Sequence, residues 1–381
     1  DHAQALRWEL ESHPARLCIQ TIDAFCHSLA SRLPMLSRAG AELQVAIDPQ
    51  HLYAEAARHT LALLDDEDSI ASAAAVLLRH RDNELLRTEQ LLVDLLSRRD
   101  QWLPLIVGLE GQRLRQRLEA DLGVEVTRRL EQLAELWPAG NLRAVTRLAA
   151  FAAANLGDEA DELAAWRGVD AVPRPVVEDL PLWRGLVQLL LTDTGSWRKA
   201  ITRRDGVPAA AQDENARLKA LIEELTRVQG LEELLQVVRF LPSARLGDDE
   251  WLVAEALLKL LKVAAAELEL LFRERGEVDH VAVAQAAVTA LGNADEPGEL
   301  ALALDHRVRH LLVDEFQDSS HTQLRLLAAL TAGWSDGDGR TLFCVGDPMQ
   351  SIYRFRQAEV GLFLRTRDHG LGALRPTALT L

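Results

Sequence analysis

Three short apolar runs interrupt a chain that otherwise has the pattern of helices. Polar or Gly residues follow each run at once, and a helical pattern follows them; the runs are Arg16–Gln20, Arg309–Val313 and Thr341–Val345. Buried parallel strands of an α/β sheet have this pattern, because helices cover both faces of the sheet. Ligands of such sheets bind beyond the carboxyl ends of the strands, so the residues after each run are candidates for function.

The sequence between the first two runs is mostly helical in pattern, with breaks that contain Pro or Gly. Leu, Val and Ala recur there at three- and four-residue spacing with Arg and Glu between them. The two runs are almost 290 residues apart, far more than the crossover between neighbouring parallel strands needs. The sequence therefore predicts a mostly helical α/β protein. Residues 1–38 and 266–381 form the α/β domain, and residues 39–265 form an all-helical insertion.

The net charge limits the kinds of partner that the sequence predicts, and the cysteine content limits the cell compartment. The formal net charge of −16 argues against a surface covered with basic nucleic-acid-binding residues. The last 42 residues, however, hold six arginines and only three carboxylates, as expected for a basic channel on an acidic body. The three cysteines lack metal-ligand spacing, and no apolar run is long enough to span a bilayer. We expect reduced thiols, a cytoplasmic location and no contact with a membrane.

Two carboxylates, Asp314 and Glu315, follow the second run directly. In nucleotide hydrolases a carboxylate at the end of a strand holds Mg²⁺, and a neighbouring carboxylate polarises the attacking water. The alternative is that both are simply favourable charges at the N-terminus of a helix. The pair alone does not distinguish these interpretations.

The third run continues into the segment Val345–Arg356. Gln350 follows a turn there, and its amide can contact a terminal phosphate or a bound water without adding charge. Tyr353 and Phe355 alternate with arginines, an arrangement in which aromatic rings stack on unstacked bases while cations meet backbone phosphates. The alternative is that the two aromatic rings pack in the core.

Together, Asp314–Asp318 and Val345–Arg356 resemble motifs II and III of the UvrD/Rep helicases, a family of superfamily 1 DNA helicases. Arg354-Phe355-Arg356 followed by Ala358-Glu359-Val360 is most similar to the RecB/AddA branch, the helicase–nucleases of double-strand-break processing. Thr21–Cys26 resembles the motif that follows motif Ia. The resemblance implies a partial RecA-like P-loop NTPase motor domain that carries a large helical insertion. It also implies 3′→5′ movement on DNA.

The resemblance also implies roles for residues of the nucleotide site. Asp314 would hold Mg²⁺, and Glu315 would activate the water that attacks ATP. Gln350 would contact the γ-phosphate. Gln317 would help to link the nucleotide site to the DNA site.

Further residues would contact DNA, single-stranded or duplex. The resemblance implies that Thr21 and Phe25 lie along the path of the strand. It implies that Tyr353 and Phe355 touch or stack on the bases. Arg356 would support that segment or contact DNA directly. A second helicase–nuclease subunit is a possible partner in this branch.

One expected element is absent from the sequence. No Gly-x-x-x-x-Gly-Lys-Ser/Thr loop occurs, and no Gly-Lys pair occurs at all, although such a loop cradles the phosphates of ATP. We therefore expect the chain to be an internal piece of a helicase that hydrolyses ATP negligibly by itself. The alternatives are a non-catalytic, helicase-derived module that binds DNA or protein, and a different P-loop ATPase.

Several other conspicuous residues have simpler structural explanations. Ser319 or Ser320 is expected to cap a helix, and Asp279 either caps a helix or belongs to the Val-Asp-Phe segment that precedes motif II in the family. Most of the eight tryptophans lie within or beside apolar helical patterns, which indicates packing in the core.

Overall fold

A computed structural model shows how these segments are arranged. It describes residues 18–32, 44–63, 69–138, 140–156, 162–292, 298–305, 308–335, 337–347 and 360–379. Among these residues, no helix is long and apolar enough to cross a lipid bilayer.

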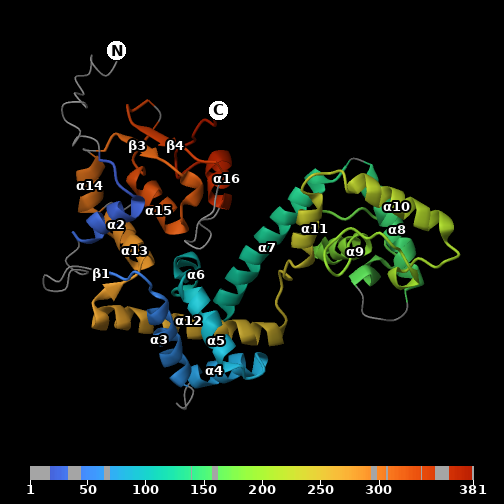
Figure 1. The fold of residues 1–381 in the computed structure, drawn as a ribbon, viewed down its shortest axis with the longest axis horizontal. Coiled ribbons are helices and arrows are strands. Elements are labelled where there is room, and N and C mark those ends of the chain that lie inside the picture. Colours follow the sequence, from blue (N-terminus) through green and yellow to red (C-terminus); the bar gives the residue numbers. More distant parts are fainter. Residues whose placement is uncertain are drawn as a thin grey trace. The chain divides into compact units, whose positions relative to one another are not determined.

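The chain forms two compact units (Figure 1). Unit 1 consists of residues 1–108 and 253–381, and unit 2 is the continuous stretch Leu109–Leu252. Unit 2 lies inside the predicted insertion 39–265, but residues 39–108 and 253–265 are compact with unit 1 instead. Which residues belong to a motor domain and which to an insertion stays a prediction.

Unit 1 combines short parallel strands with helices. Its helices are α2 (Ile22–Ala30), α3 (Gln50–Ala62), α4 (Ser69–His80), α5 (Leu85–Leu96), α6 (Arg99–Ile106), α12 (Asp248–Arg275, which begins in unit 2), α13 (His280–Leu291), α14 (Glu299–Asp305), η7 (Phe316–Asp318), α15 (His321–Leu330) and α16 (Val360–His369). Its strands are β1 (Gln44–Val45), β2 (Glu277–Val278), β3 (His310–Val313) and β4 (Thr341–Cys344).

The strands form two parallel pairs within the described residues. Strand β1 pairs with β2, and β3 pairs with β4 in a register that places Leu312 opposite Phe343. The second and third apolar runs are thus confirmed as parallel strands, but the prediction that both faces of these strands are covered is wrong. One face of the β3–β4 pair packs on Phe316, Leu327 and Leu371. On the other face the side chains of Leu312 and Phe343 are 71% and 53% exposed.

The strand predicted at Arg16–Gln20 is wrong for the residues that the structure describes there. Cys18, Ile19 and Gln20 have no strand conformation, and helix α2 begins at Ile22. Ile19 is 87% exposed. A strand needs a neighbour to complete its hydrogen bonds, and this segment pairs with no described strand. The N-terminal half of the predicted strand lies outside the described residues.

A buried charge cluster lies between the helices of unit 1. Both guanidinium ends of Arg99 donate to the carboxylate of Asp279, at 2.6 and 2.7 Å, and the hydroxyl of Tyr53 donates to the same carboxylate at 2.5 Å. Asp279 also accepts from the backbone N–H of Ala282 and so caps α13, which was one of the two alternatives for this residue. The hydrogen bonds of this cluster connect α3, α6 and the start of α13. The two buried charges, on Arg99 and Asp279, are paired with each other.

Unit 2 is all-helical within its described residues. Its helices are α7 (Gly111–Leu136), α8 (Asn141–Asn155), η4 (Glu162–Trp166), η5 (Val177–Asp179), α9 (Leu180–Leu190), η6 (Arg203–Asp205), α10 (Gln212–Leu225) and α11 (Leu231–Arg239). Along α7, Arg115–Glu119 and Arg117–Asp121 form ion pairs at i,i+4 spacing that support the helix.

The core of unit 2 contains Trp137, Trp166 and Trp183, which are among the tryptophans predicted to pack. Trp166 and Trp183 are fully buried, and Trp137 packs edge-on against Trp183. The indole N–H of Trp166 donates to the carbonyl of Leu182, and that of Trp183 to the carbonyl of Arg174, both at 2.8 Å. These bonds satisfy the polar edge of each ring, as a buried tryptophan requires.

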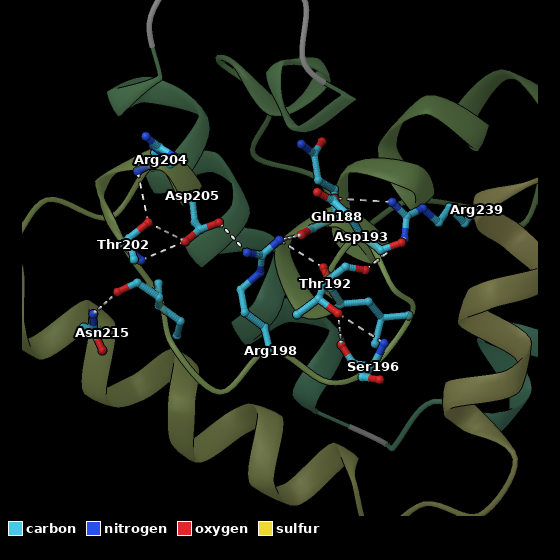
Figure 2. Close-up of polar contacts among 12 residues, drawn as sticks. Gln188, Thr192, Asp193, Ser196, Arg198, Thr202, Arg204, Asp205, Asn215 and Arg239 are labelled. Atoms are coloured by element: carbon cyan, nitrogen blue, oxygen red, sulfur yellow. Dashed lines mark hydrogen bonds and ion pairs between the residues drawn. The ribbon is translucent and has the colours of Figure 1, made fainter.

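Polar side chains hold the irregular segment that follows α9, as Figure 2 shows. Arg198 forms an ion pair with Asp205 at 2.6 Å and donates to the carbonyls of Gln188 and Leu191. Arg239 donates to the carbonyl of Thr192. The backbone groups of this turn therefore find partners without a regular ladder.

Candidate functional site

The two predicted carboxylates lie at the carboxyl end of β3. Val313 is buried, whereas Asp314 and Glu315 are both exposed. The chain turns sharply here: Glu315 has φ 50° and ψ 40°, the left-handed region. A non-Gly residue in this region is uncommon and costs on the order of 1 kcal/mol or more, so the surrounding contacts must hold it in place.

Gln317 supplies these contacts. Its side chain is buried, and its amide nitrogen donates to Oε2 of Glu315 at 2.6 Å. Its amide oxygen accepts from the backbone N–H of Asp347 at 3.1 Å. One side chain thus ties the loop after β3 to the loop after β4.

Gly346 allows this close approach. A Cβ atom at this position would lie 2.3 Å from Oε1 of Gln317 and 3.1 Å from its backbone nitrogen. The backbone N–H of Phe316 also donates to the carbonyl of Val345 at 2.8 Å. Phe316 and Gln317 after β3 therefore lie beside Val345, Gly346 and Asp347 after β4, at one edge of the sheet.

This edge has a donor set that suits Mg²⁺. Magnesium is usually held through one or two carboxylates and keeps several waters, and Asp314 presents an exposed carboxylate at the strand end. Among the described residues no group of three or more His, Cys, Asp or Glu side chains is arranged to enclose a metal. The residues present fit a partly hydrated Mg²⁺ better than an all-protein metal site.

Thr21 and Phe25 lie at the start of helix α2. Thr21 is the N-cap of this helix, and its hydroxyl accepts from the backbone N–H of Ala24 at 3.1 Å. Phe25 is half-buried and packs against the core of unit 1. Both therefore have structural roles, while Ile22 between them contacts the cluster beneath β3.

The remaining predicted site residues are Gln350, Tyr353, Phe355 and Arg356. All of them lie outside the described residues, in the gap between 347 and 360. Their predicted roles stay predictions.

A connection between α2 and α15 was not predicted. Ser320 caps α15, as expected, in a reciprocal capping box with Gln323. The amide nitrogen of Gln323 also donates to Oδ1 of Asp23 at 2.9 Å. A Ser-x-x-Gln spacing is a recognisable sign of a capping box. No local pattern, however, indicates that Gln323 meets a residue 300 positions earlier.

Two of the three cysteines are buried or half-buried, as expected of structural thiols. Cys26 on α2 is buried, Cys344 on β4 is half-buried and Cys18 is exposed, and all three are free. Burial and the neighbouring charge of Asp23 raise the pKa of the Cys26 thiol to about 12. Burial raises the pKa of Cys344 to about 11. Neither of these two thiols is a nucleophile at neutral pH.

Comparisons with known proteins agree with the predicted family. Residues 9–369 match the family described as the UvrD/REP helicase N-terminal domain. Over 129 residues the chain is 39% identical to an ATP-dependent helicase/nuclease subunit of Bacillus cereus, a match that covers 32% of this chain and 10% of the relative. Proteins of the same name from Bacillus thuringiensis and Bacillus anthracis match to the same extent.

The match to these relatives spans only a tenth of their length. The family match, by contrast, extends over nearly the whole of this chain, including the Asp314–Glu315 edge and helix α2. This protein therefore belongs to the UvrD/REP helicase N-terminal domain family.

Proposed function

We propose that this chain is part of an ATP-dependent DNA translocase of the RecB/AddA-like helicase–nuclease type. The observation that carries the proposal is the pair of exposed carboxylates at the end of β3, held by Gln317 against the loop after β4. Two loops fixed side by side beyond parallel strands are where α/β proteins bind ligands. The helical share of unit 1 and its parallel β3–β4 pair support a RecA-like motor.

In the proposed nucleotide site each residue has a separate task. Asp314 would hold Mg²⁺, which neutralises charge on the phosphate oxygens of ATP when it is bound. Glu315 would take the proton of the attacking water, with its carboxylate oriented by the hydrogen bond from Gln317. Gln350 would contact the terminal phosphate.

DNA would pass over α2 and the segment after β4. Thr21 and Phe25 would lie along the strand, and Tyr353, Phe355 and Arg356 would contact its bases and phosphates, since aromatic–cation alternation suits single strands. The proposal includes 3′→5′ polarity and a role in DNA repair and recombination in the cytoplasm. Because the relatives are named as subunits, it also includes a partner protein, the second helicase–nuclease subunit.

A non-catalytic module that binds DNA or protein is the alternative. The observation that favours it is the absence of any Gly-Lys pair from the sequence, since the lysine of a phosphate-binding loop reaches the phosphates of ATP. In the helicase proposal the 381-residue chain hydrolyses ATP negligibly by itself.

Hydrolysis by the complete gene product tests the proposal. We expect single-stranded DNA to stimulate its ATPase, and we expect Glu315→Gln to lower the stimulated kcat by about 10²–10⁴-fold. Binding of ATP, measured with a fluorescent analogue, should change little, because the lost group acts on water. A gene product without DNA-stimulated hydrolysis, or a Glu315→Gln variant with full activity, would refute the proposal and favour the module.

A further inference from the structure

The N-terminus of α15 follows the proposed catalytic loop by only a few residues and is joined to it by backbone hydrogen bonds. Backbone N–H groups of Asp318 and Ser319 donate to the carbonyls of Glu315 and Phe316, at 2.9 and 3.2 Å, and Ser319 is buried. Thr322 in the first turn of α15 donates to the buried carboxylate of Asp100 at 2.8 Å. Hydrogen bonds therefore connect the loop at Glu315 to the start of α15, and Thr322 connects that start to α6.

The oxygen and the nitrogen of the Gln323 side-chain amide both form hydrogen bonds at the start of α15. Its oxygen accepts from the backbone N–H of Ser320 at 3.0 Å, which completes the capping box. Its nitrogen donates to Oδ1 of Asp23 at 2.9 Å. The other carboxylate oxygen of Asp23 lies 3.9 Å from the ring of His280, so the Gln323 bond is the shorter of the two contacts.

Asp23 lies on α2 between the two residues proposed to face DNA. Thr21 precedes it by two positions and Phe25 follows it by two. Helix α2 also packs closely on α13, and Ile22 contacts the cluster beneath β3. Helix α2 is thus in direct contact with the element that follows the catalytic loop, although the two segments are 300 residues apart in the chain.

We propose that the Gln323–Asp23 hydrogen bond is a positioning contact that couples the strand-binding helix α2 to the catalytic loop at Glu315. This inference rests on the proposed function for the identity of the two sites. Strand binding that shifts α2 changes the position of Gln323, and the capping box and η7 carry that change to Glu315. Gln323 and Asp23 are not among the residues proposed to hold ATP or to contact DNA, so we expect the contact to set how strongly DNA stimulates hydrolysis and to leave the chemistry of the site unchanged.

The substitution Gln323→Glu isolates this contact in the complete gene product. A glutamate keeps an oxygen that accepts from the N–H of Ser320, and a capping box tolerates Glu at this position. It replaces the donor that meets Asp23 with a second carboxylate. We expect the stimulation of ATPase by single-stranded DNA to fall about fivefold to tenfold, with more DNA needed for half-maximal stimulation. We expect the rate without DNA and the KM for ATP to stay within about twofold of wild type.

A double variant restores the pair with its polarity reversed. Asp23→Asn combined with Gln323→Glu places a donor on α2 and an acceptor on α15, so stimulation should recover to within about twofold of wild type. Gln285→Glu on α13, the same chemical change in the same unit, is the matched control and should leave stimulation unaltered. Basal and stimulated rates that fall together, or a double variant without recovery, would overturn the inference.

The proposed function and the coupling contact fail in different ways. If the wild-type gene product shows no DNA-stimulated hydrolysis, the proposed function is wrong. If DNA stimulates hydrolysis and the Gln323→Glu variant is stimulated equally well, the proposed function survives and the coupling contact is wrong.

Discussion

Buried Asp279 shows how single residues stabilise unit 1. Burial alone would raise the pKa of its carboxyl, but the paired guanidinium of Arg99 and the hydrogen bonds from Tyr53 and Ala282 hold the pKa below its ordinary value. The same cluster raises the pKa of Tyr53, first through burial and then through the charge of Asp279. A buried ion pair is costly to break, because the remaining charge has no water to replace its partner.

Removing one partner of this cluster should therefore destabilise the protein strongly. We expect Arg99→Leu to lower the free energy of unfolding by about 3–5 kcal/mol, as for other buried pairs that lose one partner. The half-exposed ion pair Arg275–Glu55 is the matched control. We expect Arg275→Leu to lower the free energy of unfolding by about 1 kcal/mol or less. Urea unfolding followed by circular dichroism measures both, and equal effects would contradict the assigned role of Arg99.

The lowered pKa of Asp279 also predicts how stability depends on pH. A carboxyl whose pKa is lower in the folded state contributes its stabilisation fully above the unfolded value, near 3.8, and loses it as the pH falls through the folded value. We expect the urea concentration at which half of the wild-type protein is unfolded to decrease as the pH is lowered below about 4. Asp279→Asn should be less stable at pH 7, and its midpoint should depend less steeply on pH below about 4. An identical slope in both proteins would argue against Asp279 as a source of this acid sensitivity.

Gly346 should not tolerate a side chain. In Gly346→Ala the added Cβ would meet the amide of Gln317, so we expect a loss of about 1–3 kcal/mol in the free energy of unfolding. Gly333→Ala is the control, since nothing lies within 4 Å of a Cβ added there. Thermal unfolding of the two variants compares them directly. A Gly346→Ala protein as stable as its control would show that the two loops do not approach as described.

Helix α2 is the element on which the candidate DNA contacts and the core of unit 1 meet. Its buried side is formed by Cys26, Leu29 and Ala30, and it packs most extensively on α13. The capping hydroxyl of Thr21 fixes where the helix begins. Both the proposed DNA contacts and the coupling bond to Gln323 therefore depend on a helix whose position the core determines.

The docking of α2 can be followed by thiol labelling. In the native protein, at a pH of about 7.5, we expect a maleimide to modify exposed Cys18 fastest and half-buried Cys344 much more slowly. Cys26 should react only in denaturant, because it is buried and burial raises its pKa to about 12. Mass spectrometry of tryptic peptides gives the order. Rapid labelling of Cys26 under native conditions would show that α2 does not pack as described.

At the scale of the whole molecule, the chain divides into two units with separate cores. Every residue of the core of unit 2 lies between Val126 and Leu241, inside one continuous stretch of chain. The core of unit 1 combines helices from both ends of the sequence. A unit whose core is contained in one segment has what it needs to fold independently.

We expect residues 109–252 to fold as an isolated fragment. The fragment should unfold cooperatively in urea, with helical circular dichroism, and the emission of buried Trp166 and Trp183 should shift to longer wavelength in the same transition. Trp183→Ala should lower its stability by about 3–5 kcal/mol. A fragment that lacks a cooperative transition would mean that unit 2 needs contacts from unit 1.

Much of the local architecture follows from the sequence because its causes are local. Apolar runs predicted β3 and β4, because apolar side chains are typical of parallel strands. The exposure of Leu312 and Phe343 on one face was not predicted, since an apolar run does not show whether a second layer covers the strand. The caps at Ser320 and Asp279 follow from side chains that satisfy the free N–H groups of a helix start. The segment at Cys18–Gln20 was wrongly predicted because an apolar run alone cannot show whether a neighbouring strand is present.

What the sequence by itself determined is the family, the strand ends and the positions of Asp314, Glu315 and Gln317 along the chain. Only the tertiary structure decided that Gln317 holds Glu315 against the loop of Asp347, that Gln323 reaches Asp23, and that unit 2 is bounded at 109 and 252. The physical reason is the range of the forces concerned. Helix periodicity and capping act within a few residues, whereas these contacts join segments up to 300 residues apart, whose proximity is set by the packing of the whole unit.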